Sequence, residues 1–245
     1  AQTSRIITNA HRINEGQMPV LENSDSDFIY EEQNVPELIL NRVRELCLRE
    51  SARLGTGEPL MDVQVLTPMK KGTLGVENLN RILQEALNPP ELGKPEHNFG
   101  SLLLRQGDKI MQIKNDYKVE WQKPGPDGAL QEGAGAFNGD LGTLFRLANL
   151  NRVLHVLFDD GRLAMYDFTQ AEELDLAYCI SIHKSQGSEF PTVLLPLAGG
   201  PPMLLNRNLL YTAVTRAKKL VYCLGRRDTI ARMVRTVQSR RRFTA

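Results

Sequence analysis

Residues 177–197 read AYCISIHKSQGSEFPTVLLPL, two apolar runs separated by a polar loop that contains a glycine. The first run covers residues 177–182 and the second covers residues 193–197, and both have the length and aliphatic content of buried strands. Continuous apolar strands joined by crossover connections are typical of a parallel sheet that is covered on both faces. This stretch therefore predicts an α/β fold with polar residues at the end of a strand.

The pattern continues on both sides of this stretch. Downstream, a helix over residues 207–217 is followed by a strand over residues 220–224 and a helix over residues 228–237. Upstream, the apolar spacing predicts helices over residues 4–14, 36–53 and 79–87, with a strand over residues 63–66. Repeated βα units predict a parallel sheet with right-handed crossovers.

The middle of the chain has a different character. Short candidate strands cover residues 109–113, 143–147, 153–158 and 163–166, and turn-rich segments separate them. A small β barrel would bury such strands, so the expected architecture is an α/β domain interrupted by a β module. The expected boundaries are 1–98 for the first part of the α/β domain, 99–172 for the module and 173–245 for the remainder.

The composition restricts the class of protein. Thirty Lys and Arg residues against 29 Asp and Glu residues give a net charge of +1, so a nucleic-acid partner must be bound by a local basic surface. Cys47, Cys179 and Cys223 form no C-x-x-C pair, which argues against a zinc site or a disulfide framework. No apolar stretch has the length of a membrane span, and no signal peptide precedes the first helix, so a cytoplasmic protein with no metal site is expected.

Two polar segments carry the candidate chemistry. The loop after residues 177–182 places polar residues at the carboxyl edge of the sheet, where open α/β sheets bind ligands, although an ordinary helix cap is the bland alternative. The helix over residues 207–217 is expected to align Thr212, Thr215, Arg216 and Lys219 beside an apolar face. A solvated basic face is the alternative interpretation of this second segment.

In this order and at this separation, the two segments resemble the fifth and sixth helicase motifs of superfamily 1, and specifically of RecD-like helicases (the exodeoxyribonuclease V alpha subunit family). Further matching segments are residues 6–19, 66–72, 78–84, 107–117 and 137–142, whereas residues 124–135 look like a local insertion. The resemblance implies a RecA-like parallel sheet, the second motor domain (2A), interrupted by a small SH3-like β-barrel module (2B).

The resemblance also implies roles at an ATP site. Arg216 would be an arginine finger that stabilises charge on the transferred phosphate, with a surface salt bridge as the alternative. Gln186, Gly187 and Glu189 would contact the nucleotide: Gly187 by allowing close backbone approach and Glu189 by accepting a ribose hydroxyl proton. Glu189 as a helix-capping acid is the competing interpretation.

A second set of residues would hold single-stranded DNA through phosphates and stacking, without reading bases. A solvated turn is the alternative for the two lysines, a structural histidine is the alternative for His183, and Trp121 is more often a core residue than a stacking platform. The basic end of the chain, including Arg240, Arg241 and Arg242, is either a further phosphate contact or a solvated tail. The DNA-contacting set is Lys70, Lys71, Asn115, Tyr117, His183 and Ser185.

The 245 residues contain no G-x-x-x-x-G-K-[ST] phosphate loop. With a first residue other than methionine, this predicts a C-terminal fragment that is inactive as an ATPase alone. The resemblance implies that the full-length helicase uses ATP and Mg²⁺, moves 5′ to 3′ on single-stranded DNA, and pairs this region with an N-terminal RecA-like domain and possible RecBC-like subunits. A noncatalytic single-stranded nucleic-acid-binding module is the main alternative, and an unrelated α/β enzyme for a small nucleotide is the third.

Overall fold

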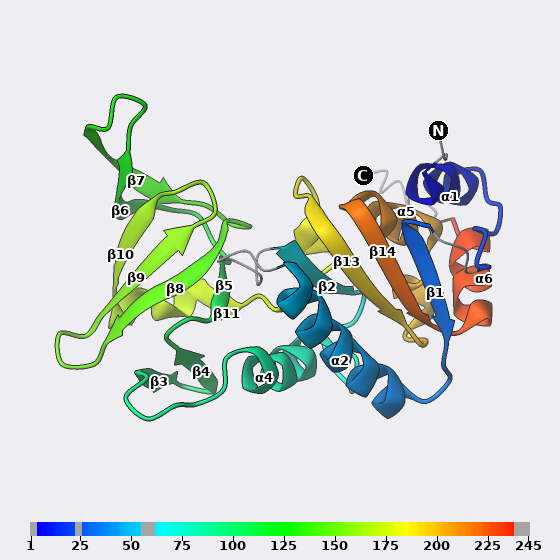
Figure 1. The fold of residues 1–245 in the computed structure, drawn as a ribbon, viewed down its shortest axis with the longest axis horizontal. Coiled ribbons are helices and arrows are strands. Elements are labelled where there is room, and N and C mark those ends of the chain that lie inside the picture. The colour runs from blue at the N-terminus through cyan, green and yellow to red at the C-terminus, as the bar shows by residue number, and fades with distance from the viewer. Residues whose placement is uncertain (1–3, 23–25, 55–61, 238–245) are drawn as a thin grey trace, which may run out of the picture. The chain divides into compact units, whose positions relative to one another are not determined.

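The computed structural model describes residues 4–22, 26–54 and 62–237, and it divides the chain into two compact units (Figure 1). We call Ala1–Leu79 with Cys179–Ala245 the α/β unit, and Asn80–Tyr178 the β-rich unit. Helix α4 (Val76–Leu87) contains the first of the two boundaries. Residues 80–98 and 173–178 thus group with the β-rich unit, whereas the sequence pattern assigned them to the α/β segments.

The α/β unit is built on one parallel sheet. Its strand order is β1-β14-β13-β2-β12, and every neighbouring pair runs parallel. The central strands β13 and β2 are almost entirely buried, so both of their faces are covered and most of their residues are apolar, with buried Gln64 and Thr192 among the exceptions. This confirms the predicted parallel α/β fold. The strands are β1 (Phe28–Glu32), β2 (Val63–Thr67), β12 (Cys179–Ser181), β13 (Phe190–Leu197) and β14 (Ala217–Gly225).

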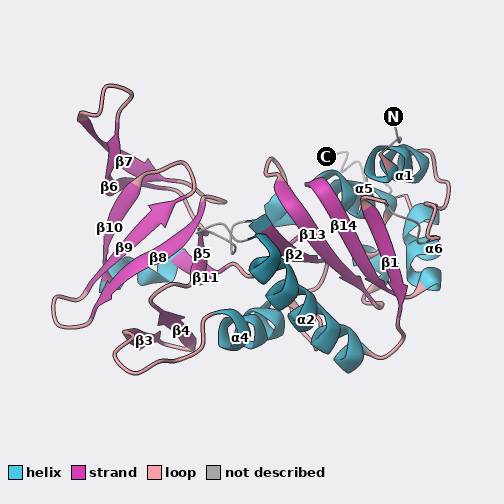
Figure 2. Cartoon of the chain, viewed as in Figure 1, coloured by secondary structure: helices cyan, strands magenta, loops and turns pink. Residues whose placement is uncertain are grey.

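Helices supply the covering layers of this sheet. Helix α2 (Pro36–Leu54) packs on β2 and β13, whereas α5 (Arg207–Thr215) packs on β13 and β14 with α1 (Arg5–Asn14) and α6 (Arg227–Arg235) beside it (Figure 2). Side chains cap two of these helices, because Ser4 Oγ accepts from the Ile7 amide and Asn206 Oδ1 accepts from the Leu209 amide. Short 3₁₀ turns, η2 (His183–Ser185) and η3 (Pro202–Leu204), occupy the loops on either side of β13.

The β-rich unit contains a seven-stranded antiparallel sheet of order β11-β5-β8-β9-β10-β6-β7 and a separate β3-β4 hairpin. The insertion seen in the sequence is the β6-β7 hairpin, which pairs from Asp116↔Ala136 to Pro124↔Leu130. The elements of the β-rich unit are β3 (Glu96–Phe99), β4 (Leu102–Arg105), β5 (Lys109–Gln112), β6 (Asp116–Pro124), β7 (Leu130–Ala136), β8 (Leu141–Ala148), β9 (Val153–Phe158), β10 (Leu163–Asp167), η1 (Phe168–Glu173) and β11 (Leu174–Leu176).

The buried carboxylate of Asp108 links the first residues of the β-rich unit, the β4-β5 turn and the last residue of the unit. Asp108 has no exposed surface, and its two oxygens accept hydrogen bonds from Gln84 Nε2 (2.8 Å), Asn88 Nδ2 (2.8 Å) and Tyr178 Oη (2.7 Å). The Arg105 amide donates a fourth bond at 2.6 Å. Burial raises the pKa of Asp108, and these four bonds oppose the rise. Helix α4, the β4-β5 turn and the chain exit at Tyr178 therefore depend on one side chain.

Three differences from the sequence prediction have physical causes. Helix α5 ends at Thr215, so Lys219 lies on strand β14 and not on the predicted helix face, because pairing of Ala217 with Phe190 starts the strand there. Strand β1 was not predicted, since it lies at the edge of the sheet and alternates between buried and less buried residues. The apolar run at residues 177–182 contributes only β12 (Cys179–Ser181), because the chain changes units at Tyr178.

We predict that Asp108→Asn destabilises the β-rich unit by about 1–3 kcal/mol, because the new amide group would direct its hydrogens at groups that are themselves donors. Urea unfolding followed by tryptophan fluorescence measures this, since Trp121 is the single tryptophan of the chain and lies in this unit. Asp127→Asn is the matched control, because exposed Asp127 accepts only from the Ala129 amide through an oxygen that asparagine keeps. Equal unfolding free energies for the two variants would refute the role of Asp108.

Candidate functional site

Two adjacent parallel strands end side by side in the α/β unit. Strands β2 and β12 pair in register down to Thr67 and Ser181, and the Ile182 amide donates to the Thr67 carbonyl at 3.1 Å. The segments that follow these strands hold Lys70 and Lys71 after β2, and His183 and Ser185 after β12. The sheet therefore brings these four predicted residues to one carboxyl edge, as open parallel sheets do for their ligand-binding loops.

The loop after β2 is held closed by its own backbone. The Val76 amide donates to the Met69 carbonyl (2.9 Å), and Thr67 Oγ1 donates to the Leu74 carbonyl (2.7 Å). A β-carbon at Gly75 would lie 2.6 Å from the backbone of Lys70 and Lys71, so only glycine fits there.

The two lysines of this loop are both exposed but differ in their partners. Lys71 Nζ pairs with Glu77 at 2.7 Å and lowers the pKa of that carboxyl group. Lys70 has no ion-pair partner among the described residues, although its backbone carbonyl accepts from the Glu77 amide at 3.4 Å. The Lys70 ammonium is thus the one presented to an anion on this loop.

The turn after β12 separates exposed from buried residues. His183, Gln186 and Gly187 are exposed, and Gly187 has a φ of +82° with open space where a β-carbon would stand. Ser185 is fully buried, and its hydroxyl donates to the Ile182 carbonyl. This places Ser185 as a support of the turn and not as an exposed DNA contact, whereas His183 and Gly187 face solvent.

Arg216 connects the two segments that the sequence singled out. It is the C-terminal cap of α5, and its guanidinium donates to the carbonyl oxygens of Ser188 (Nη1, 3.0 Å) and Thr212 (Nε, 3.2 Å) and to Thr215 Oγ1 (Nη2, 3.3 Å). In return, the Arg216 carbonyl accepts from the Phe190 amide at 2.8 Å. The side chain of Arg216 therefore binds the Gln186–Glu189 loop at Ser188, and its backbone binds the first residue of β13.

The charge of Arg216 stays uncompensated within the described residues. All three of its acceptors are neutral oxygens, and it forms no ion pair with a described carboxylate, so the salt-bridge alternative finds no support there. Glu189, by contrast, is exposed and lies 3.6 Å from Lys218 Nζ. Strand β13 begins at the next residue, so the helix-capping interpretation of Glu189 is wrong.

Asn115 and Tyr117 belong to the β-rich unit. Asn115 Oδ1 accepts from the Asn138 amide at 2.9 Å, and Tyr117 is 71% exposed. Phe137, which sequence reasoning did not select, packs edge-on against Tyr117 with ring centroids 5.6 Å apart and is 41% exposed. The signal for Phe137 was present, since it begins the matched segment at residues 137–142, but a single phenylalanine gives no sign of exposure.

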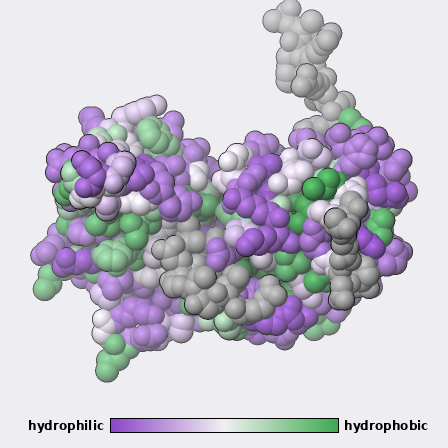
Figure 3. Space-filling model, turned by 45° about the horizontal axis from the view of Figure 1, so that its top comes forward, coloured by the Kyte–Doolittle hydropathy of each residue, from purple (hydrophilic) through white to green (hydrophobic). Residues whose placement is uncertain are grey.

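Trp121 packs against its own hairpin. The Trp121 ring lies across Gly133, where a β-carbon would come within 2.4 Å of the indole, so this ring packs within the β6-β7 hairpin. Arg240, Arg241 and Arg242 lie outside the described residues. On the face drawn in Figure 3, apolar side chains form small groups within a mainly polar surface.

Metal and membrane features are limited in the described part of the chain. Residues 4–22, 26–54 and 62–237 contain no cluster of three or more His, Cys, Asp or Glu side chains placed to hold a metal ion. Within the same ranges, no helix is both long and apolar enough to span a bilayer.

Comparison with known protein families finds a match within each unit. Residues 176–224 match the UvrD-like helicase C-terminal domain, and residues 79–158 match the SH3 domain of ATP-dependent RecD-like DNA helicases. The chain carries a UvrD-like helicase C-terminal domain and a RecD-like SH3 domain. This confirms the RecD-like resemblance inferred from the sequence, and the RecD-like SH3 match falls within the β-rich unit apart from its first residue.

Curated relatives of this RecD-like region are much longer proteins. The ATP-dependent RecD2 DNA helicase of Deinococcus radiodurans is 38% identical over 165 residues, which are 66% of this chain and 20% of the relative. The RecBCD enzyme subunit RecD of Mycolicibacterium smegmatis is 32% identical over 182 residues, which are 73% of this chain and 28% of the relative. The chain thus matches less than a third of either relative's length.

Among solved structures, the Pif1 helicase from Bacteroides in complex with ADP-AlF3 and single-stranded DNA has a similar fold. The two share a TM-score of 0.53 at 16% identity, over 97% of this chain and 52% of the Pif1 chain. At this level of identity the comparison supports the fold alone. Together with the two family matches, it gives no support to an unrelated α/β enzyme.

Proposed function

We propose that this chain supplies, within an ATP-dependent DNA helicase, the arginine finger and part of the single-stranded DNA track. The observation that carries this proposal is the position of Arg216, held by Ser188 of the Gln186–Glu189 loop and lacking a carboxylate partner among the described residues. A guanidinium oriented by neutral acceptors keeps its charge for a phosphate that arrives from another domain.

The residues fit the part of ATP that such a site would contact. Gly187 leaves open space beside its backbone, exposed Gln186 and Glu189 flank it, and Arg216 lies against the same loop. Mg²⁺ and the phosphate loop would come from a RecA-like domain outside this chain, because the 245 residues contain no G-x-x-x-x-G-K-[ST] loop. When bound, the nucleotide and metal supply the phosphoryl-transfer chemistry, and this chain orients and neutralises charge.

The DNA track would begin at the carboxyl edge of the parallel sheet. Lys70 and exposed His183 follow neighbouring strand ends and would donate to phosphates, while Lys71 would exchange its pairing with Glu77 for a phosphate. Buried Ser185 would act by fixing the turn that carries His183. Asn115 and Tyr117 of the β-rich unit would add polar and stacking contacts.

We extend the proposal to the longer protein in the same terms. The helicase would be cytoplasmic, with domain 2A formed by residues 1–98 and 173–245 and module 2B by residues 99–172. It would move 5′ to 3′, and RecBC-like subunits are its proposed partners, because one of the matched relatives is a RecBCD subunit.

A noncatalytic single-stranded nucleic-acid-binding module remains the second candidate. The exposed lysines and aromatic residues alone would suffice for that function. A pure binding module has no use for an arginine held against a glycine loop, so the geometry of Arg216 favours the motor. The two functions separate in a nucleotide-turnover assay of the longer protein.

In that longer protein, Arg216→Ala is expected to lower the rate of ATP turnover by about a thousandfold or more, because arginine fingers contribute on that scale. Nucleotide affinity should change far less, since the finger acts mainly on charge in the transition state. Steady-state ATPase rates and equilibrium binding of a fluorescent nucleotide measure the two effects. Arg216→Lys should not restore full turnover, because an ammonium cannot reproduce the bidentate guanidinium.

Arg226→Ala is the matched control for Arg216. Arg226 is an exposed arginine of the same unit that pairs with Asp228 at 2.7 Å, away from the Gln186–Glu189 loop. Its loss should leave turnover near the unmodified rate. If nucleotide binding falls as far as turnover in Arg216→Ala, the residue binds substrate and is not a finger.

The 245-residue chain alone is expected to hydrolyse no ATP, because the phosphate loop and the magnesium ligands are absent from its sequence pattern. Purified chain is mixed with ATP, Mg²⁺ and single-stranded DNA, and phosphate release is compared with a protein-free control. Sustained release above that control would contradict the proposal that catalysis needs a second motor domain.

Removing either ring of the Tyr117–Phe137 pair should weaken binding of single-stranded DNA by about 1–3 kcal/mol, the usual contribution of a base stacked on an aromatic side chain. Tyr117→Ala and Phe137→Ala are compared by fluorescence anisotropy, with Tyr117→Phe as the control that keeps the stacking surface. The salt dependence should stay unchanged in the aromatic variants and decrease in Lys70→Ala, because only the lysine releases counterions. Unchanged affinity in both alanine variants would exclude the pair from the track.

A further inference from the structure

The inserted hairpin gives the β-rich unit a strand edge. Strand β7 is the last strand of the seven-stranded sheet, so in the described part of the chain its outer side lacks a strand partner. Residues 130–132 and Ala134 are exposed, and Arg162 Nη1 reaches only the Gly135 carbonyl near the end of the strand. An exposed edge of this kind can pair with an extended segment of another chain.

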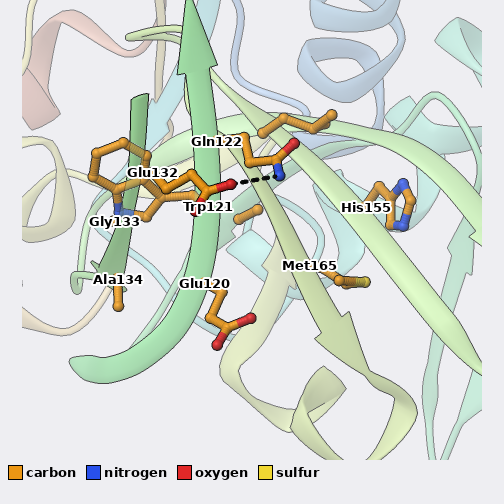
Figure 4. A pocket seen from close by; sticks show the side chains of 10 residues that line it. Glu120, Trp121, Gln122, Glu132, Gly133, Ala134, His155 and Met165 are labelled. Atoms are coloured by element: carbon orange, nitrogen blue, oxygen red, sulfur yellow. Dashed lines mark hydrogen bonds between the residues drawn. The ribbon is translucent and has the colours of Figure 1, made fainter. Parts of the chain in front are cut away.

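An acidic pocket of about 480 Å³ lies beside this edge (Figure 4). The register pairs Glu120 with Ala134, Gln122 with Glu132 and Gln122 with Leu163, so these side chains share one face of the sheet. Met165 and His155 are also direct cross-strand neighbours. The pocket is lined by Glu120, Trp121, Gln122, Glu132, Gly133, Ala134, His155, Leu163, Ala164 and Met165.

The residues that line this pocket include two carboxylates and no lysine or arginine, although Arg146 is the cross-strand partner of His155. Neither Glu120 nor Glu132 forms an ion pair within the described ranges, and Glu132 accepts only a long 3.4 Å bond from Gln122 Nε2. Burial and the nearby Arg146 lower the pKa of His155, so this imidazole is mainly neutral near pH 7 and adds no compensating charge. Two carboxylates at one opening repel phosphates, which separates this surface from a DNA track.

The floor of the pocket suits the aliphatic part of a long basic side chain. Met165 is 52% exposed, and Leu163 beside it is partly exposed on the same strand face. Lysine and arginine bury their methylene stems on such surfaces and keep the charged end at the rim, where Glu120 and Glu132 stand. The β7 edge, the apolar floor at Leu163 and Met165 and the two carboxylates therefore all fit the same ligand. That ligand is an extended chain with basic side chains on one face.

We propose that the β7 edge and the Glu120–Glu132 pocket together bind an extended basic segment of a partner protein. The segment adds as a strand to β7 through backbone hydrogen bonds, and alternate lysine or arginine side chains reach over the pocket to the two carboxylates. Most of β7 and three of the ten pocket-lining residues, Glu132, Gly133 and Ala134, come from the insertion at residues 124–135, so the surface depends on the hairpin. None of its lining residues is among those proposed above for ATP or DNA, although Tyr117 of the DNA track lies on the same strand, β6.

The test uses the full chain and a fluorescein-labelled peptide of alternating arginine and threonine, whose binding is measured by fluorescence anisotropy. Binding is expected for this peptide and not for a glutamate–threonine peptide of equal length. Glu120→Gln with Glu132→Gln should weaken binding about tenfold, as expected for the loss of two partly exposed charge pairs. N-methylation of alternate backbone amides of the peptide should also weaken binding, because it removes strand hydrogen bonds.

Glu91→Gln is the matched control, since Glu91 is an exposed carboxylate of the same unit outside the pocket that pairs with Lys94 at 3.2 Å. Unchanged tryptophan fluorescence and unfolding midpoints would show that the glutamine variants are folded. Equal binding of the acidic peptide would overturn the proposal. So would unchanged affinity in the double glutamine variant, or displacement of the basic peptide by single-stranded DNA.

Discussion

The parallel sheet of the α/β unit sets the constraint on which the rest of the site depends. Its central strands β2 and β13 are buried on both faces and mostly apolar, so the exposed charged groups of the site stand where strands end. Thr67 of β2 and Ser181 of the neighbouring strand β12 end in register, which puts the Lys70 loop next to the His183 turn. Residues separated by more than a hundred positions in the chain therefore meet at one edge without any direct bond between their side chains.

Arg216 shows how the same constraint fixes a single side chain. It follows the last residue of α5 and precedes β14, and the first pair of β14 with β13 locks the Arg216 carbonyl onto the Phe190 amide. The guanidinium donates to the Ser188 carbonyl and to the end of its own helix. Because neutral oxygens orient the Arg216 guanidinium, its position is fixed while no described carboxylate neutralises its charge.

The β-rich unit is organised by a different interaction. Asp108 satisfies four donors from α4, the β4-β5 turn and Tyr178, so a buried charge closes this unit at the place where the chain enters and leaves it. With that closure secured near its base, the sheet tolerates a long hairpin at its far edge. The hairpin then brings Glu132 opposite Gln122 and creates a surface that neither the parallel sheet nor the Asp108 cluster requires.

The sequence by itself determined the parallel sheet, the interruption by a β-rich unit and the pairing of the two helicase-like segments, because apolar period and loop composition are local properties. Tertiary structure decided what each polar residue does. Ser185 is buried and donates to the Ile182 carbonyl, and Glu189 pairs with Lys218. Lys219 lies on a strand and not on the predicted helix, because Ala217 pairs with Phe190. The exposure of Phe137 beside Tyr117 and the meeting of Glu120 with the inserted hairpin depend on strand register, which no local pattern encodes.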